Sequence, residues 1–469
     1  MSVLPGGLRV CVESVPQYGR GLAAVALTVA AGGDDDPAGR HGTAHLVEHL
    51  MFPRSGGGSA DPAGEGYAAL VAGAGGVCNA ETHRDHTVFH TTVPAESLPD
   101  ALAWEARRLL GFAPTEGVIR TETDVIGEEI RGAGDAGRYW ESALGALYPG
   151  SRDSFGTAAE LAGITAGEVE AFFRAHYTAP RMVLSVVGDV DPAGVMGVVG
   201  EVFRGVGMPG AAGEARTAEA ARAAREIRAA GEGRAAEATR AAEQTRTATE
   251  TGAATEIRAA EAPRTATETR TAPLPAARPG VAVGHPLPDP VADRPDYLAQ
   301  AVLAQVLGRS RLPALARSAR DGHRLTSATV TCGYHGQWLA SAAPDLTLAV
   351  LGRAPGTEVG AAVDIWRSVL RAVAEGPLPE AEHRRAVNSL LVAWHRQADS
   401  LPTRAVALGR HALLLPGSAG PDALPAELRR TTPAEVAAAA RALLEGPVTV
   451  TELAPQADTE FAPQKGTVG

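Results

Sequence analysis

Cysteine, lysine and aromatic residues are scarce in this sequence. Its three cysteines, Cys11, Cys78 and Cys332, are isolated from one another, so we expect a reducing compartment and no disulfide framework. Lys465 is the only lysine, and this bias towards arginine is typical of GC-rich coding and carries no functional information. Aromatic residues make up 4% of the 469 residues, whereas hydrophobic residues reach 45%, which suffices for an ordinary globular core.

Long apolar runs and an excess of positive charge are also absent. No run approaches the ~18 consecutive apolar residues that a membrane-spanning helix needs. The stretch from Met1 to Arg20 lacks the basic start and the apolar core of a signal peptide. Because the formal net charge is −11, nothing indicates a nucleic-acid-binding surface. We therefore expect a soluble, cytoplasmic protein of about two to three domains that binds neither nucleic acid nor membranes.

Residues 42–52, Gly-Thr-Ala-His-Leu-Val-Glu-His-Leu-Met-Phe, predict a short buried helix. Helical geometry places His45 and His49 one turn apart on the same side, so both imidazoles can bind one metal ion. Glu48 lies about one turn from His45 and can reach a water molecule on that ion. This order is the inverse of the commoner zinc helix H-E-x-x-H and supports the same chemistry, in which zinc acidifies a water and a carboxylate accepts its proton. A chance match of two core histidines and a surface glutamate is the alternative that the motif alone leaves open.

A catalytic zinc usually takes three protein ligands and keeps one open position, so a third ligand is needed. The best candidate lies in the glutamate-rich helix predicted at residues 122–131. Glu122 and Glu129 are seven residues apart and share a face with Val125, whereas Glu128 points about 100° away from Glu129. We therefore predict Glu129 as the ligand, Glu128 in solvent, and Glu122 as a group that orients His49 or Glu129. A merely solvated helix face is the alternative, and the shared apolar face argues against it.

Three further histidines, His83, His86 and His90, lie in or beside two predicted strands and offer additional nitrogen ligands. We favour structural roles for them, because the proposed site does not need them. A structural role is also expected for His176, at the end of a helix that opens with a capping-box pattern at residues 165–168.

The first half of the chain resembles the pitrilysin/insulinase family of zinc peptidases, which includes the mitochondrial processing peptidases. The resemblance extends beyond the histidine motif over nearly all of residues 1–205. It is carried by the acidic turn Gly33–Pro37, by Phe52, by Asn79-Ala80 and Asp85-His86-Thr87, by Glu122 and Glu129, and by Gly156-Thr157 and the segments 173–177 and 186–190.

The resemblance implies roles for individual residues. His45, His49 and Glu129 would hold one zinc ion per chain, and Glu48 would be the general base, with Glu122 beside it in the catalytic group. The strand that contains Asn79 and Ala80 would pair with the backbone of a peptide substrate, a mode that reads peptide conformation more than side chains.

The resemblance also implies an α+β fold of two homologous domains, each a mixed or antiparallel β-sheet covered by helices, which together form half of a clamshell chamber. We expect a catalytic domain at residues 1–208 and a non-catalytic copy at 276–455, followed by a flexible tail at 456–469. The second half repeats the order of strands and helices in outline, but it contains no inverted zinc motif.

Residues 209–275 differ from the rest of the chain in composition. They consist mostly of Ala, Arg, Glu and Thr, and they repeat short units such as Arg-Thr-Ala-Thr-Glu-Thr at 246–251 and 264–269. Such a segment buries too little apolar area to offset the entropy of an ordered chain. We therefore predict a linker that is largely disordered or partly helical and has no catalytic role, with partner binding as the alternative.

One departure from the family concerns the second domain. Active members carry an Arg and a Tyr seven residues apart that hold the substrate, and here Arg320 occupies the first position while Ser327 occupies the second. We expect a zinc-dependent metalloendopeptidase that cleaves peptides or unfolded leader segments. The alternatives are a non-catalytic or weakly active subunit of a heterodimeric peptidase and a zinc-binding scaffold without turnover. The expected partner is a homologous subunit, or a second copy in a homodimer.

Overall fold

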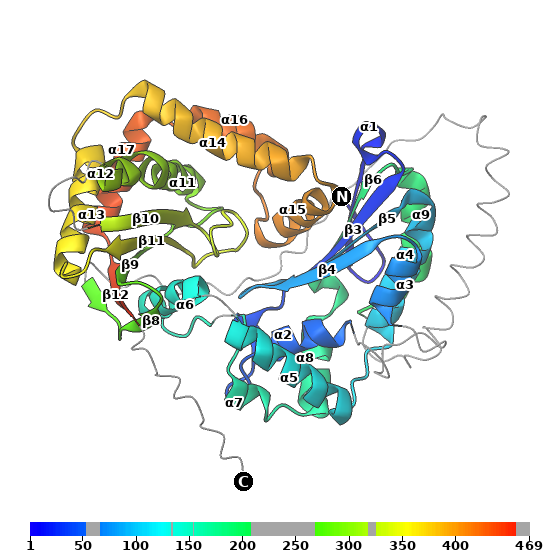
Figure 1. Cartoon of the computed structure of the whole chain (residues 1–469). Helices are drawn as coiled ribbons and strands as arrows, with labels where there is room; N and C mark the ends of the chain where they lie inside the picture. Colours follow the sequence, from blue (N-terminus) through cyan, green and yellow to red (C-terminus); the bar gives the residue numbers. More distant parts are fainter. Residues whose placement is uncertain (53–65, 133–134, 153, 208–267, 318–324, 456–469) are drawn as a thin grey trace, which may run out of the picture.

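The structure is a computed structural model that describes residues 1–52, 66–132, 135–152, 154–207, 268–317 and 325–455. It contains two halves, each built on one β-sheet with helices packed against it (Figure 1). This is the α+β fold class predicted from the sequence, and that prediction is confirmed. The tail predicted at 456–469 and most of the predicted linker lie outside the described residues.

The first sheet has six strands in the order β1-β2-β6-β3-β5-β4. All neighbouring strands are antiparallel except β2 and β6, which are parallel. The central strands β3 and β6 are buried on both faces, as the continuous apolar run of β3 predicts. The strands are β1 (Ser2–Val3), β2 (Arg9–Ser14), β3 (Leu22–Val29), β4 (Val77–Thr82), β5 (Thr87–Pro94) and β6 (Met182–Gly188).

The first sheet packs by one face on α2, α4, α8 and α9, which contribute much of the core of this half. The α-helices described in this half of the chain run in sequence from α1 to α9. They are α1 (Pro16–Gly19), α2 (Thr43–Leu50), α3 (Tyr67–Gly73), α4 (Leu98–Leu110), α5 (Glu116–Gly132), α6 (Asp135–Leu147), α7 (Ala158–Leu161), α8 (Ala166–His176) and α9 (Pro192–Val202).

The second sheet has the order β10-β11-β9-β12-β7, with β8 also paired to β12. Its strands are β7 (Glu268–Arg270), β8 (Leu274–Ala276), β9 (Gly280–Pro286), β10 (Leu325–Cys332), β11 (Leu346–Arg353) and β12 (Val448–Pro455). The helices described in the second half of the chain are α11 (Arg294–Val306), α12 (Leu312–Arg317), α13 (Val359–Ala374), α14 (Glu380–Ala398), α15 (Leu401–Leu414), α16 (Leu424–Arg430) and α17 (Pro433–Glu445).

The two halves share one topology. Strands β10, β11, β9 and β12 take the places of β4, β5, β3 and β6, with the same antiparallel pairing. The short strands β7 and β8 pair parallel with β12, as β2 pairs parallel with β6. The zinc-motif helix α2 follows β3, and its counterpart α11 follows β9 but carries neither histidine nor glutamate.

The predicted boundary at residue 275 is wrong in one respect. Strands β7 and β8 occupy residues 268–276, so the second sheet begins inside the predicted linker. Each strand has three residues, too few to show an apolar pattern, and each is held by backbone pairing with β12. Composition therefore could not separate them from the linker.

Each half contributes one helix that packs on the sheet of the other half. Helix α6 packs on the second sheet, where Trp140 and Leu144 join a buried cluster with Leu346 and Leu453. Helix α15 packs on β3, β6 and β5 of the first sheet (Figure 1). The two helices are equivalent, since α6 follows α5 as α15 follows α14. The halves thus exchange corresponding helices.

Small residues allow these helices to lie close to the sheets. A Cβ atom on Gly409 of α15 would lie 2.3 Å from Thr28 Oγ1 of β3, so only glycine fits. In the second half the glycine is on the strand, because a Cβ on Gly284 of β9 would lie 2.8 Å from the Cβ of Ala143 on α6.

Candidate metal centre

Helix α2 is fixed at its start by one buried carboxylate. Asp36 accepts hydrogen bonds from the backbone N–H groups of Gly42 at 2.7 Å and Ala44 at 2.8 Å, and its Oδ2 lies 2.9 Å from Nδ1 of His41. A negative charge at this end also complements the helix dipole. Gly42 has φ of 99°, a conformation that glycine adopts without strain. These contacts fix the position of the first turn of α2.

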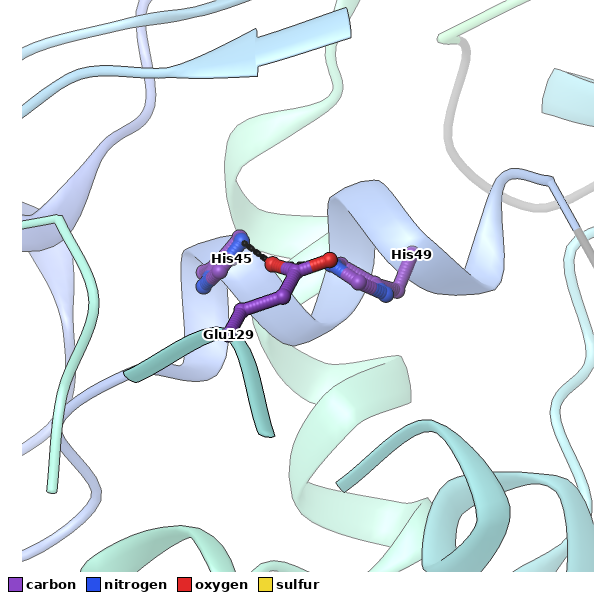
Figure 2. A group of neighbouring side chains, drawn as sticks. All are labelled: His45, His49 and Glu129. Carbon is purple, nitrogen blue, oxygen red and sulfur yellow. Dashed lines mark ion pairs between the residues drawn. The ribbon is translucent and has the colours of Figure 1, made fainter. Parts of the chain in front are cut away.

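The two histidines of α2 face the carboxylate of Glu129 on α5. Nε2 of His45 lies 3.6 Å from Glu129 Oε2, and Nε2 of His49 lies 3.4 Å from the same oxygen. The two rings meet edge to face with centroids 4.8 Å apart. Figure 2 shows the carboxylate reaching across from α5 to lie between the imidazoles. Both histidines are largely buried, whereas the Glu129 side chain is 46% exposed, which leaves the site open on that side.

This donor set fits a zinc ion. One ligand atom from each of His45, His49 and Glu129 can be chosen so that all three lie within 4.8 Å of one another. Ligand atoms about 2.0–2.1 Å from a tetrahedral zinc lie about 3.3–3.4 Å apart, close to the two separations from Glu129. Within the described ranges this is the one group of at least three His, Cys, Asp or Glu side chains with such geometry. Two imidazoles and one carboxylate are the ligand types of an open, catalytic zinc site.

Glu122 supports the site from behind His49. Its Oε2 lies 3.2 Å from His49 Nδ1, and its side chain is 4% exposed. This contact directs the other nitrogen, Nε2, towards Glu129, as an outer-shell carboxylate does for a metal-binding imidazole. Burial favours the neutral ring, but the hydrogen bond to Glu122 and the charges of Glu48 and Glu129 outweigh it and raise the pKa of His49. Glu122 was predicted in the catalytic group and as a residue that orients His49 or Glu129, and the contact that the structure shows is with His49.

Glu48 lies beside the two histidines and contacts the edge strand β4. Thr82, the last residue of β4, donates a short hydrogen bond from Oγ1 to Glu48 Oε2. Burial raises the pKa of Glu48 to about 7, although the Thr82 hydrogen bond and His49 oppose the rise. This pKa describes the metal-free site, and a bound cation would lower it.

The predicted substrate strand lies at the rim of this site. Asn79 and Ala80 lie in β4, which pairs with β5 along one edge only. Among the described residues no strand pairs with the other edge of β4. Ala80 packs on the core beneath the sheet, whereas Asn79 is exposed on the opposite face. An unpaired edge of this kind can add a further strand through backbone hydrogen bonds.

Other predicted residues lie away from the three ligands. Glu128 is 76% exposed and pairs with Arg131 at 2.6 Å, as its helical position predicts. His83 and His86 are buried in the turn between β4 and β5, with rings stacked 4.3 Å apart. His90 lies on β5 opposite Asn79.

Three further positions remain, two in the second half and one at the end of α8. Arg320 lies outside the described residues. Ser327 is exposed on the edge strand β10, opposite Gly352. His176 ends α8 with its Nδ1 3.6 Å from Asp35 Oδ1, away from the three ligands.

Sequence reasoning missed two residues near the site, Thr82 and Arg410. Asn79, Ala80 and Thr82 form an Asn-Ala-x-Thr sequence, and the alternation of a strand places Thr82 on the same face as Ala80, towards α2. That signal was available. Arg410 contacts the β4–β5 turn from α15, more than 320 residues along the chain, and no local pattern predicts such a contact.

Two family models match this chain. The family Insulinase (Peptidase family M16) matches residues 12–130, which include α2 and the Glu129 position, and the Peptidase M16 inactive domain matches residues 163–390. The two matches cover well over half of the chain. The chain belongs to peptidase family M16. The resemblance stated from the sequence is therefore confirmed.

Curated relatives match the M16 chain over part of their length. An uncharacterized zinc protease of Mycobacterium tuberculosis is 31% identical over 207 residues, which are 43% of this chain and 46% of the relative. A probable mitochondrial-processing peptidase subunit beta of Arabidopsis thaliana is 29% identical over 210 residues, 43% of this chain and 38% of the relative. The chain spans about half the length of the curated relatives it matches.

Solved structures share the M16 fold over nearly the whole chain. A protease from Helicobacter pylori has a TM-score of 0.74 at 18% identity, covering 97% of this chain and 98% of that one. A peptidase M16 inactive domain from Pseudomonas fluorescens has a TM-score of 0.70 at 17% identity, covering 97% of each. In the part of the M16 chain that the structure describes, every helix is too short or too polar to cross a membrane.

Proposed function

We propose that this M16 chain is a zinc-dependent metalloendopeptidase that hydrolyses peptide bonds. The observation that carries the proposal is the convergence of His45, His49 and Glu129, with Glu48 beside them on the same helix as the histidines. A zinc ion held by these three side chains would acidify a water molecule and polarise the carbonyl group of the substrate.

The protein's own side chains would move the proton. Glu48 is suited to accept a proton from the attacking water and to deliver it to the leaving nitrogen, because it lies on the same helix as the two histidines and beside them. Burial raises the pKa of its carboxyl group to about 7 in the metal-free site, and a bound zinc ion would lower that pKa. The hydrogen bond from Thr82 fixes one oxygen of the carboxyl group and leaves the other for this transfer. Glu122 would hold His49 in the orientation that presents Nε2 to the metal.

The substrate in this proposal is a peptide in extended conformation, such as an unfolded or leader segment. It would add to the unpaired edge of β4 at Asn79 and Ala80, whose backbone groups would bind the peptide backbone. Since Thr82 on the same strand contacts Glu48, an added strand would run past the catalytic group.

Three variants test the proposal. Glu48→Gln should retain about one zinc per chain and lose cleavage of an unfolded peptide, because it keeps the ligands and removes the base. Glu129→Gln should lose zinc, whereas Glu128→Gln should keep both zinc and cleavage. Metal content would be measured by atomic absorption, and cleavage with a quenched fluorescent peptide. Loss of zinc from Glu48→Gln, or zinc loss in Glu128→Gln with retention in Glu129→Gln, would contradict the assignment.

We further propose that full activity needs a partner subunit. Ser327, at the place where active relatives carry Tyr, is exposed on the edge strand β10, and one relative is named as a processing-peptidase subunit. A serine cannot reach as far as a phenol, and a buried acceptor left unpaired costs ~1–3 kcal/mol. The isolated chain would then be weakly active, the alternative being a homodimer that is competent by itself.

Dilution and complementation separate these cases. The purified chain should cleave peptides poorly, and a homologous subunit that carries both Arg and Tyr but lacks the zinc motif should restore activity. Ser327→Tyr should raise the activity of the isolated chain. Full activity at high dilution, or no change in Ser327→Tyr, would refute the need for a partner.

A further inference from the structure

One arginine from the second half binds the turn that leads out of β4. Arg410 lies on α15, and its side chain is 13% exposed. Its Nη2 lies 3.0 Å from Glu81 Oε2 and 2.6 Å from His83 Nε2, and its Nε donates to His86 Nε2 at 2.9 Å. Its Nη1 also donates to Gln337 Oε1 at 3.3 Å. All three guanidinium nitrogens are therefore engaged, and three of the four partners lie at the β4–β5 turn.

Neutral histidines make this cluster possible. Burial lowers the pKa of His83 to about 3 and also lowers the pKa of His86, so both rings are uncharged next to the guanidinium. An uncharged imidazole can accept a hydrogen bond at Nε2. Nδ1 of His86 lies 2.8 Å from Oδ1 of Asp85, which fixes the tautomer that accepts from Arg410. The planar guanidinium suits several acceptors at once, which a lysine ammonium would not match in geometry.

The contacts of Arg410 bracket Thr82. Glu81 and His83, the residues before and after Thr82 in the chain, both bind Arg410. Thr82 itself points to the other face of the strand and donates a hydrogen bond to Glu48. Side chains alternate between the faces of a strand, so the end of β4 is held from one side by Arg410 and meets Glu48 on the other.

We propose that Arg410 is a positioning residue for Glu48, acting through Thr82, so that the second half of the chain helps to set the geometry of the catalytic base. The inference rests on the proposed peptidase function. A misplacement of a catalytic group by ~1 Å can cost about 100-fold in rate, so a loosened Thr82 would lower kcat even with all metal ligands in place.

Other hydrogen bonds also attach the β4–β5 turn to the second half, so a substitution of Arg410 should not detach the turn. Arg84 Nη2 donates to the carbonyl of Ala342 at 2.6 Å, and the N–H of Ala342 donates to Asp85 Oδ2 at 2.6 Å. These bonds hold the β4–β5 turn to the second half without Arg410. Loss of the Arg410 guanidinium should therefore loosen the end of β4 and leave the chain folded.

The chain offers a matched control on the same helix. Arg404 is also a largely buried arginine of α15 that reaches the first half, where it pairs with Glu13 of β2 at 2.9 Å. It also pairs with Asp422 at 2.8 Å, and it makes no hydrogen bond to the β4–β5 turn. Arg404→Gln thus removes a comparable contact between the halves at a distance from Thr82.

The test compares Arg410→Gln and Arg404→Gln, each alone and with Thr82→Val. Arg410→Gln should lower kcat by about 10- to 100-fold with zinc content unchanged. In the Thr82→Val background it should lower kcat by less than about twofold, because the contact through which it acts is already gone. Any effect on KM, from weaker strand addition at β4, should persist in that background. Arg404→Gln should leave kcat within about twofold of the parent in both backgrounds.

A measurement without turnover accompanies the kinetics. Amide hydrogen exchange in the metal-free protein should rise at residues 77–83 in Arg410→Gln and stay unchanged there in Arg404→Gln. Unchanged kcat in Arg410→Gln, equal losses of kcat with and without Thr82, or unchanged exchange at β4 would overturn the inference. If the parent protein shows no zinc-dependent cleavage with or without its partner, the proposed function fails, and the exchange data alone decide whether Arg410 holds this strand.

Discussion

Removal of the Glu122 carboxylate should weaken zinc binding without unfolding the protein. Glu122 Oε2 lies 3.2 Å from His49 Nδ1, and both side chains are largely buried. Glu122→Ala leaves a buried N–H without its acceptor and frees the imidazole to rotate, so the ring must be reordered when the metal binds. Loss of such an outer-shell partner typically lowers metal affinity about 10- to 100-fold, or about 1.4–2.7 kcal/mol.

A graded series makes this prediction sharper. Glu122→Gln keeps an oxygen that can accept from Nδ1 but removes the charge, and should therefore cost less than Glu122→Ala. Zinc affinity would be measured by competition with a chelator of known affinity, with circular dichroism as the check on folding. Glu128→Gln is the control, since Glu128 is exposed and pairs with Arg131 on the same helix. If Glu122→Ala binds zinc within about twofold of the parent, the positioning role is wrong.

Three other predictions address the fold. Gly409→Ala should destabilise the protein by about 1–2 kcal/mol in urea unfolding, because overlap with Thr28 outweighs the gain in helix propensity, whereas Gly145→Ala, with no atom near its Cβ, should stabilise it by about 0.5–1 kcal/mol. Equal effects of the two substitutions would contradict the close packing of α15. Replacing residues 211–267 with a short Gly/Ser linker should leave the melting temperature and peptide cleavage nearly unchanged; a large drop in either would show that the segment packs on the halves. Burial raises the pKa of Asp345 to about 7, so the folded state retains a proton that the unfolded state has lost, and stability should fall as pH rises from about 4 to about 7. Asp345→Asn should flatten that fall in unfolding measured at pH 5 and pH 8, and an unchanged slope would assign the pH dependence to other groups.

The sequence predicted the parts of the site that depend on local geometry. The spacing of His45, Glu48 and His49 is a property of one helix, and the seven-residue interval between Glu122 and Glu129 is a property of another. The structure brings these helices together at 3.4 Å between His49 and Glu129. Local spacing thus placed the side chains on the faces that meet, while the need for a third ligand, together with the family resemblance, indicated that the two helices pair.

What could not be predicted depends on contacts between distant segments. Arg410 has no sequence pattern that links it to His83, because their proximity arises only when α15 covers the first sheet. The sequence also does not predict that α6 and α15 are exchanged between the halves. The apolar face of an amphipathic helix indicates that the helix covers a sheet, but it does not indicate which sheet. Strands β7 and β8 were not predicted, because backbone pairing with β12 holds them in place and their side chains form no strand pattern.

The exchange of helices means that neither half is a self-sufficient folding unit. Residues 1–207 alone would leave the buried Ala24, Ala26 and Val187 without α15, and would carry on α6 an apolar face, centred on Trp140, with nothing to cover. Such a fragment should be prone to aggregation. The second half alone would have the reciprocal defect. Produced together as two separate polypeptides, however, the fragments should assemble, each supplying the surface that the other lacks, so a break in the backbone between residues 208 and 267 should be compatible with a native structure.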